Sequence, residues 1–93
     1  MLRVPVDVEP RHIKKGIRGN PGKCAIALAL KTSLRKMHLK AKSMCVCSET
    51  ELRLKDGDYQ ATLPAKADKF IDQFDTGMRV KPISFVLRFK KVK

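Results

Sequence analysis

Five side chains of this sequence belong to types that act as nucleophiles, general bases or soft-metal ligands: Cys24, Cys45, Cys47, His12 and His38. A thiol enzyme needs a cysteine of lowered pKa beside a histidine, and only Cys24, near the start of an apolar helix, has a position that could lower its pKa. Cys45 and Cys47 have a single residue between them, whereas zinc ligands are usually separated by roughly two to four residues. Free cysteine is among the most buried residue types. We therefore expect buried, reduced thiols and solvated histidines, with no metal, cofactor or catalytic residue.

Two further patterns resemble ligand-binding motifs only in part. Gly16-x-x-Gly19-x-x-Gly22 has the glycine spacing of a phosphate loop, but it follows no strong strand and lacks the Gly-Lys-Ser/Thr ending. The aspartates within residues 68–75 lie at helical spacing opposite an apolar stripe, which favours a solvated helix face over a metal cluster. Neither pattern supplies a set of catalytic groups, so we expect a protein that is not an enzyme.

Positive charge is concentrated in one part of the chain. Residues 10–48, the basic window, carry ten lysines and arginines and no aspartate or glutamate, while residues 49–78 have a net charge of −3 and residues 79–93 a net charge of +6. Unpaired positive charge repels itself and slightly destabilises the folded state, and a partner rich in phosphate would offset this repulsion. The candidate partner-binding residues are Lys14, Lys15, Arg18, Lys23, Lys31, Arg35, Lys36, Lys40 and Lys42.

The aromatic residues indicate how such a surface would bind. Single-stranded nucleic acid is usually bound by exposed aromatic side chains that stack on bases, but the four phenylalanines lie in apolar stripes and leave only Tyr59. We therefore expect salt-sensitive contacts to backbone phosphates. Two alternatives remain open: a basic face that serves only solubility, and a surface for anionic lipid headgroups. The second is disfavoured because the helix that carries the lysines is apolar on nearly every side.

The first half of the chain predicts a strand and two helices. Residues 2–8 alternate between apolar and polar side chains, as in a half-buried strand. Residues 10–15 form a short helix that Gly16 closes in a left-handed conformation. Asn20 is expected to cap a buried central helix over residues 21–34, which would hold the basic residues on either side of it.

The second half predicts three more strands, a helix and a basic tail. We expect short strands at 44–47, 51–55 and 59–63, with Asp56-Gly57 as a two-residue hairpin loop. A third helix starts at Pro64, and a final strand covers 83–90. The fold class is α+β: a small antiparallel or mixed sheet of four to five strands, with two to three helices packed on it, in a single domain of residues 1–93. No apolar run reaches the roughly 20 residues that span a bilayer, and the first residues lack a signal-peptide core.

Several motifs, spread over most of the chain, resemble a group of small phage and prophage proteins: Val4-x-Val6, His12-Ile13-x-x-Gly16, Cys24-Ala-Ile-Ala-Leu-Ala-Leu30, Tyr59-x-Ala-x-Leu63-Pro64, Phe70-Ile71-x-x-Phe74-Asp75-x-Gly77 and Pro82-x-Ser84-Phe85. Small basic phage proteins include anti-CRISPR proteins that bind the type I-F guide-RNA surveillance complex, and the chain is similar to these in size and character. The resemblance implies a non-enzymatic inhibitor in the host-cell cytoplasm that binds a host Cas ribonucleoprotein, guide RNA included, and blocks target DNA. No membrane partner is expected, for the reason given above for the helix that carries the lysines.

Two other functions remain open at this point. One is a general nucleic-acid-binding protein of phage or ribosome-like type, which would use the same basic residues. The other is a thiol enzyme or small metalloprotein built on the cysteines and histidines. Members of the phage group often carry acidic residues where this chain has its basic window, so we expect this protein's own function to reside there.

Overall fold

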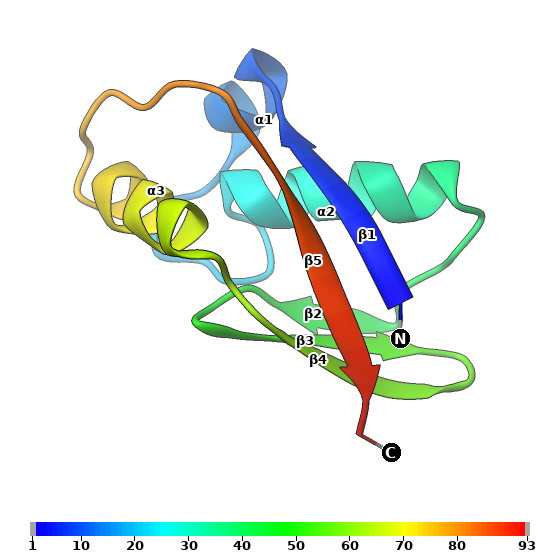
Figure 1. Ribbon diagram of the computed structural model, residues 1–93. Coiled ribbons are helices and arrows are strands. Elements are labelled where there is room, and N and C mark those ends of the chain that lie inside the picture. Colours follow the sequence, from blue (N-terminus) through cyan, green and yellow to red (C-terminus); the bar gives the residue numbers. More distant parts are fainter. Residues whose placement is uncertain (1, 93) are drawn as a thin grey trace.

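The computed structural model describes residues 2–92 (Figure 1). Its elements are, in chain order, β1 (Leu2–Val8), α1 (Pro10–Lys15), α2 (Ala25–Lys36), β2 (Ser43–Cys45), β3 (Glu49–Leu54), β4 (Gly57–Thr62), α3 (Ala65–Asp75) and β5 (Ile83–Lys91). Three helices thus pack with one five-stranded sheet. The predicted α+β class is confirmed.

The sheet is antiparallel throughout and has the strand order β1-β5-β4-β3-β2. β1 pairs with β5 along its whole length, from Leu2 opposite Phe89 to Val8 opposite Ile83. β5 pairs with β4 only at the end, where Lys90 and Lys91 lie opposite residues 59–60. The sheet therefore curls into a long β1–β5 ribbon and a β2–β3–β4 meander, and α2 lies in the space that the two parts enclose (Figure 1).

The central helix supplies much of the core. Ala25, Ile26, Ala27 and Leu30 of α2 are fully buried, as is the inward face of β1. Burying a large aliphatic side chain stabilises a fold by about 1.5–3 kcal/mol, so this packing holds α2 firmly. The basic residues that flank α2 are consequently attached to a rigid element.

The start of α2 differs from the prediction. The helix begins at Ala25 instead of residue 21, and Cys24 is its N-cap, accepting a hydrogen bond from the Ala27 amide at its Sγ atom (3.4 Å). Asn20 caps a turn instead: its Oδ1 accepts from the Gly22 amide at 3.0 Å, and its carbonyl accepts from the Lys23 amide. Asx turns and helix caps share the same residue types, which is why the sequence did not separate them.

Two glycine predictions also need correction. Gly16 closes α1 with φ −65°, not in the left-handed region. A Cβ at this position would lie 2.6 Å from the Ala25 backbone nitrogen, so glycine is required by a close approach of the chain. The hairpin loop is Lys55-Asp56, one residue earlier than predicted, because Leu54 pairs with Gly57. Gly57, with φ 147°, begins β4.

Candidate nucleic-acid interface

The nine predicted binding residues are all exposed. Within residues 2–92 the ion pairs join Arg11 to Glu9, Arg53 to Asp58 and Lys91 to Asp56, so none involves a residue of the predicted set. Their side chains are not all free, however. The Arg18 Nε donates to the Phe74 carbonyl at 3.1 Å, and its guanidinium lies 5.9 Å from the Phe74 ring centroid. Arg18 therefore attaches the loop of residues 16–22, which we call the glycine loop, to α3.

The solvent side of α2 presents one narrow stripe. Lys31 and Arg35 lie one turn apart on it, and Lys36 follows as the last residue of the helix. The other helix positions are buried or partly covered. Two cations on the same face of a fixed helix can act together on one anion.

The end of α2 brings further cations back to this stripe. The Leu39 amide donates to the Leu34 carbonyl (2.8 Å) and the His38 amide to the Arg35 carbonyl (3.1 Å), while His38 has φ 60°. This is a Schellman motif, which reverses the chain after a helix. Glycine usually occupies the left-handed position, and here a histidine does. The reversal places Lys40 beside the side chains of the last helical turns.

The reversed chain and the helix enclose a shallow hollow, which we call the α2 groove. Its volume is about 480 Å³, and Lys31, Arg35, His38 and Lys40 line it over an apolar base of Leu34 and Leu39. The structure therefore brings together three residues of the predicted set. It adds His38, for which only exposure to solvent was expected.

A second hollow continues on the other side of the same loop. It shares His38 and Lys40 with the α2 groove, and Lys55 and Tyr59 extend it. The Tyr59 hydroxyl donates to Asp56 Oδ2 at 2.7 Å, and this hydrogen bond raises the Tyr59 pKa. Tyr59 is half-buried, and its hydroxyl is committed to a carboxylate. Base stacking on a free aromatic ring therefore finds little support here.

His12 is buried, against the expectation that it would be solvated. Its Nδ1 accepts from the Glu9 amide at 3.0 Å, so the proton lies on Nε2, which faces Thr32 Oγ1 at 3.2 Å. Burial is the main cause of its lowered pKa, and the positive charges of Arg11 and Lys36 lower it further. The neutral ring joins α1 to α2 and faces the inside of the protein.

The cysteines do not form a reactive site. Burial raises the pKa of Cys24 and outweighs the helix-terminal hydrogen bonds from the Ala27 and Ile26 amides, so its position at the helix start does not lower the thiol pKa. Burial also raises the Cys45 pKa, and Cys47 raises it further. Only Cys24 is buried; Cys45 is partly covered, and Cys47 is exposed and donates to the Glu49 carbonyl at 3.0 Å. The described part of the chain contains no group of three or more histidines, cysteines and acids that could hold a metal.

The glycine loop has its backbone donors occupied by the protein itself. Gly19, with φ 72°, donates its amide to Asp75 Oδ1 at 2.9 Å, and Ile17 donates to the Lys23 carbonyl. A phosphate loop instead directs several free amides at its ligand. The loop is therefore structural, and the aspartate that it meets is one of those predicted to be merely solvated.

Comparisons with known proteins complete the description of this surface. Among residues 2–92, the helices are too short or too polar to cross a bilayer. Neither protein-family models, nor curated proteins, nor solved structures give a match to the chain. No enzyme family or enzyme fold is indicated, and the resemblance to phage proteins stays a prediction.

Proposed function

We propose that this protein is a non-enzymatic binder of nucleic-acid backbone phosphates and that the α2 groove is its contact surface. The observation that carries the proposal is the position of Lys31, Arg35 and Lys40 around one hollow, without an ion-pair partner in the described residues. Like charges held together in this way are unfavourable in the free protein, and a phosphate backbone relieves the repulsion while releasing condensed counterions.

The helix dipole accounts for only part of this arrangement. Basic residues near a helix C-terminus gain about 0.3–1 kcal/mol from the dipole, which explains a preference for Arg35 and Lys36 in the last turn. Lys31 lies in the middle of the helix, and Lys40 lies beyond its end. The dipole stabilises these two residues little, so their position around the same hollow favours binding of an external anion.

The contacts would be to the backbone and not to bases. The four phenylalanines, at 4%, 4%, 7% and 0% exposed, are part of the core and offer no stacking surface. Lysine and arginine reach phosphate oxygens without any requirement for sequence. We therefore expect binding that depends strongly on salt and weakly on base composition.

The narrower function that the resemblance implies is inhibition of a Cas surveillance complex. Its guide RNA is held by protein and offers the same phosphates, so the α2 groove suits this partner as well as free nucleic acid. Affinity for an assembled type I-F guide-RNA complex at ~150 mM salt, where the Debye length is ~8 Å, with weak binding to naked RNA and duplex, would favour inhibition. The reverse order of affinities would favour a general nucleic-acid-binding protein.

The experiment that tests the proposal is a salt series of fluorescence anisotropy with a labelled 24-base-pair duplex. The groove variant is Lys31→Gln/Arg35→Gln. Its matched control is Arg88→Gln/Lys90→Gln, which removes the same two residue types from exposed positions on β5. Log affinity falls as log salt rises, and each phosphate contact adds about 0.9 to the steepness of this fall. The groove variant should therefore make the slope shallower by about 1.8.

The control separates a defined surface from general attraction. We expect the control variant to keep the wild-type slope to within about 0.5, because β5 is not part of the groove. Equal losses in the two variants would mean that binding follows net charge alone, and an unchanged groove variant would mean that this surface does not bind nucleic acid.

A further inference from the structure

A second basic hollow lies beside α3, at some distance in the chain from the basic window. It has a volume of about 360 Å³, and its cations are Lys66 and Lys69 from the helix and Arg79 and Lys81 from the segment that follows. Gln73 adds a carboxamide to the same wall. We call it the α3 hollow. The sequence did not indicate it, because the aspartates of the same helix led only to the expectation of a solvated helix face.

The structure separates the two kinds of charge around α3. Asp68, Asp72 and Asp75 lie outside the hollow. Two of them are engaged elsewhere, since Asp75 accepts from the Gly19 amide and Asp68 accepts from the Ser48 hydroxyl at 3.4 Å. Among the described residues, none of the three acids forms an ion pair with a cation of the hollow.

The chain forms this hollow in the same way as the α2 groove. After α3 the Gly77 amide donates to the Phe74 carbonyl (3.1 Å) and the Met78 amide to the Gln73 carbonyl (2.9 Å), with Gly77 at φ 81°. This second Schellman motif turns the chain back along the helix. It brings Arg79 and Lys81 to the helix face that carries Lys66 and Lys69.

These four cations are unfavourable in the free protein. In the chain from residue 2 to residue 92, none of them takes part in an ion pair. Lys66 also lies in the first turn of α3, where the positive end of the helix dipole disfavours a cation. A bound polyanion would relieve both effects.

We propose that the α3 hollow is a second phosphate-binding site, which holds nucleic-acid backbone at a point separate from the α2 groove. The nature of the ligand rests on the proposed function; the clustering of the cations does not. Arg79 can bind two phosphate oxygens at once through its planar guanidinium, and the lysines add point charges around it. Phe70 in the wall is only 4% exposed, so base stacking contributes little.

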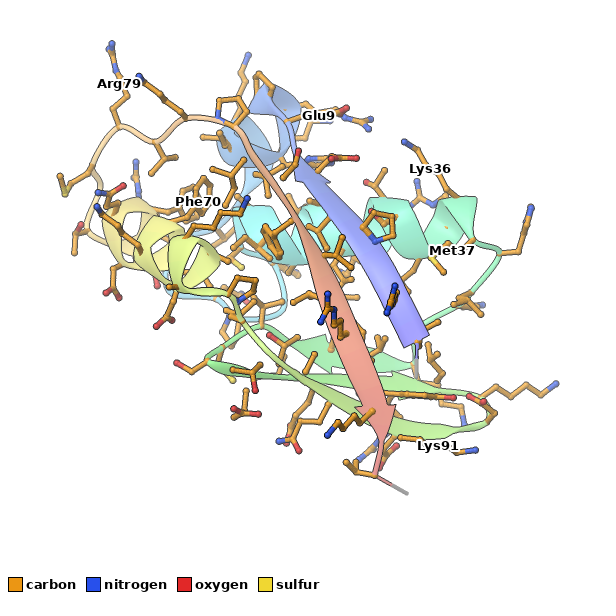
Figure 2. The ribbon with its side chains drawn as sticks, viewed as in Figure 1. Glu9, Lys36, Met37, Phe70, Arg79 and Lys91 are labelled. Atoms are coloured by element: carbon orange, nitrogen blue, oxygen red, sulfur yellow. The ribbon has the colours of Figure 1, made fainter. Side chains whose placement is uncertain are left out.

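The two sites lie apart in the molecule. Figure 2 shows Arg79 well separated from Lys36, the last residue of α2, which precedes the chain reversal that forms the α2 groove. The longest dimension of the protein is 37 Å, which corresponds to about 11 base pairs at about 3.4 Å per base pair. A duplex of 24 base pairs is therefore long enough to reach both sites on one protein.

The first test uses the same duplex and salt series with the variant Lys69→Gln/Arg79→Gln. This variant removes one lysine and one arginine, as the groove variant and the β5 control do. We expect the slope of log affinity against log salt to become shallower by up to about 1.8. The fold should be unchanged, because both side chains are exposed. A slope equal to that of the β5 control would overturn the proposal.

A second measurement keeps the two proposals distinguishable. In a ¹⁵N-HSQC titration with inorganic tripolyphosphate, we expect the amide signals of residues 66–73 and 79–83 to shift in the wild type, and to shift less in Lys69→Gln/Arg79→Gln. These shifts would support the α3 site even if the groove variant left duplex binding unchanged. Their absence, or equal shifts in the variant, would overturn it even if the α2 groove bound the duplex.

Discussion

The α2 groove and the outer face of the β2–β3–β4 meander are both exposed and both rich in charge. They differ in whether the charged side chains have partners within the protein. On the meander, Arg53 Nε pairs with Asp58 Oδ1 at 3.1 Å, and Thr62 Oγ1 donates to Glu49 Oε1 at 2.9 Å. At the groove, Lys31 and Arg35 have no such partner in the described chain. A charged group that already has a partner in the protein gains less from a ligand, so the unpaired surface is the better candidate for binding.

The largest effect that we predict concerns the helix beneath the groove. Leu30 is 0% exposed and is followed directly by Lys31. Leu30→Ala should lower the free energy of unfolding by about 2–5 kcal/mol, because it leaves a cavity in the core. Urea denaturation measures this loss. Lys31→Gln should leave the urea midpoint nearly unchanged, and a comparable loss there would show that Lys31 stabilises the fold instead of serving a ligand.

The His12 contact predicts a dependence of stability on pH. The His12 pKa is lowered from 6.5 in the folded protein, so the unfolded chain takes up its proton more readily. Stability should be full above pH 6.5 and should decrease as the pH falls below it. We expect His12→Gln to be less stable by about 1–3 kcal/mol at pH 7.5, through loss of buried hydrogen bonds.

Urea midpoints between pH 7.5 and pH 5.5 check this prediction. Carboxylates titrate mostly below this range, so the variant should show a nearly flat profile while the wild type loses stability. The same slope in both proteins would contradict the assignment of a buried, neutral His12.

The meander should tolerate loss of its ion pair. Arg53→Gln/Asp58→Asn leaves the net charge unchanged and should alter the free energy of unfolding by less than about 1 kcal/mol, because exposed ion pairs contribute little. Anisotropy with the 24-base-pair duplex should give an affinity within about twofold of the wild type. A loss as large as that of Lys31→Gln/Arg35→Gln would remove the distinction between the two surfaces.

A further small effect concerns the turn at the end of α2. His38 has φ 60°, a conformation that costs a residue with a side chain roughly 1–2 kcal/mol and costs glycine almost nothing. Since glycine also gives the unfolded chain more freedom, His38→Gly should raise the free energy of unfolding by about 0.5–1 kcal/mol. Thermal unfolding measures this gain. A destabilised variant would show that the His38 side chain itself holds the turn.

Hydrophobic periodicity predicted most of the fold. The period-two patterns of β1 and β5 and the apolar stripe of α3 each lie on one buried face, so these elements were found with small errors at their ends. The start of α2 was wrong, because Asn20 and Pro21 suit a turn and a helix N-terminus equally well. In the structure, Gly16 lies close to Ala25, the first residue of the helix. That contact joins segments that local patterns do not connect.

The candidate site was predictable only in part. Charge density pointed to Lys31, Arg35 and Lys40, but it could not show which members of the predicted set share a hollow. It also missed Lys66 and Arg79, since their grouping depends on a chain reversal after α3. One signal could have indicated the α3 hollow. A helix with lysines on one face is followed by a glycine and then by a basic segment.

The most direct test of the central claim is a ¹⁵N-HSQC titration of the wild-type protein with a 24-base-pair duplex at low salt. Binding at the α2 groove predicts that the amide signals of residues 31–42 shift or broaden first, and that those of the meander, residues 49–62, change little. Changes concentrated on the meander, or no changes at duplex concentrations that saturate a basic control protein, would contradict it.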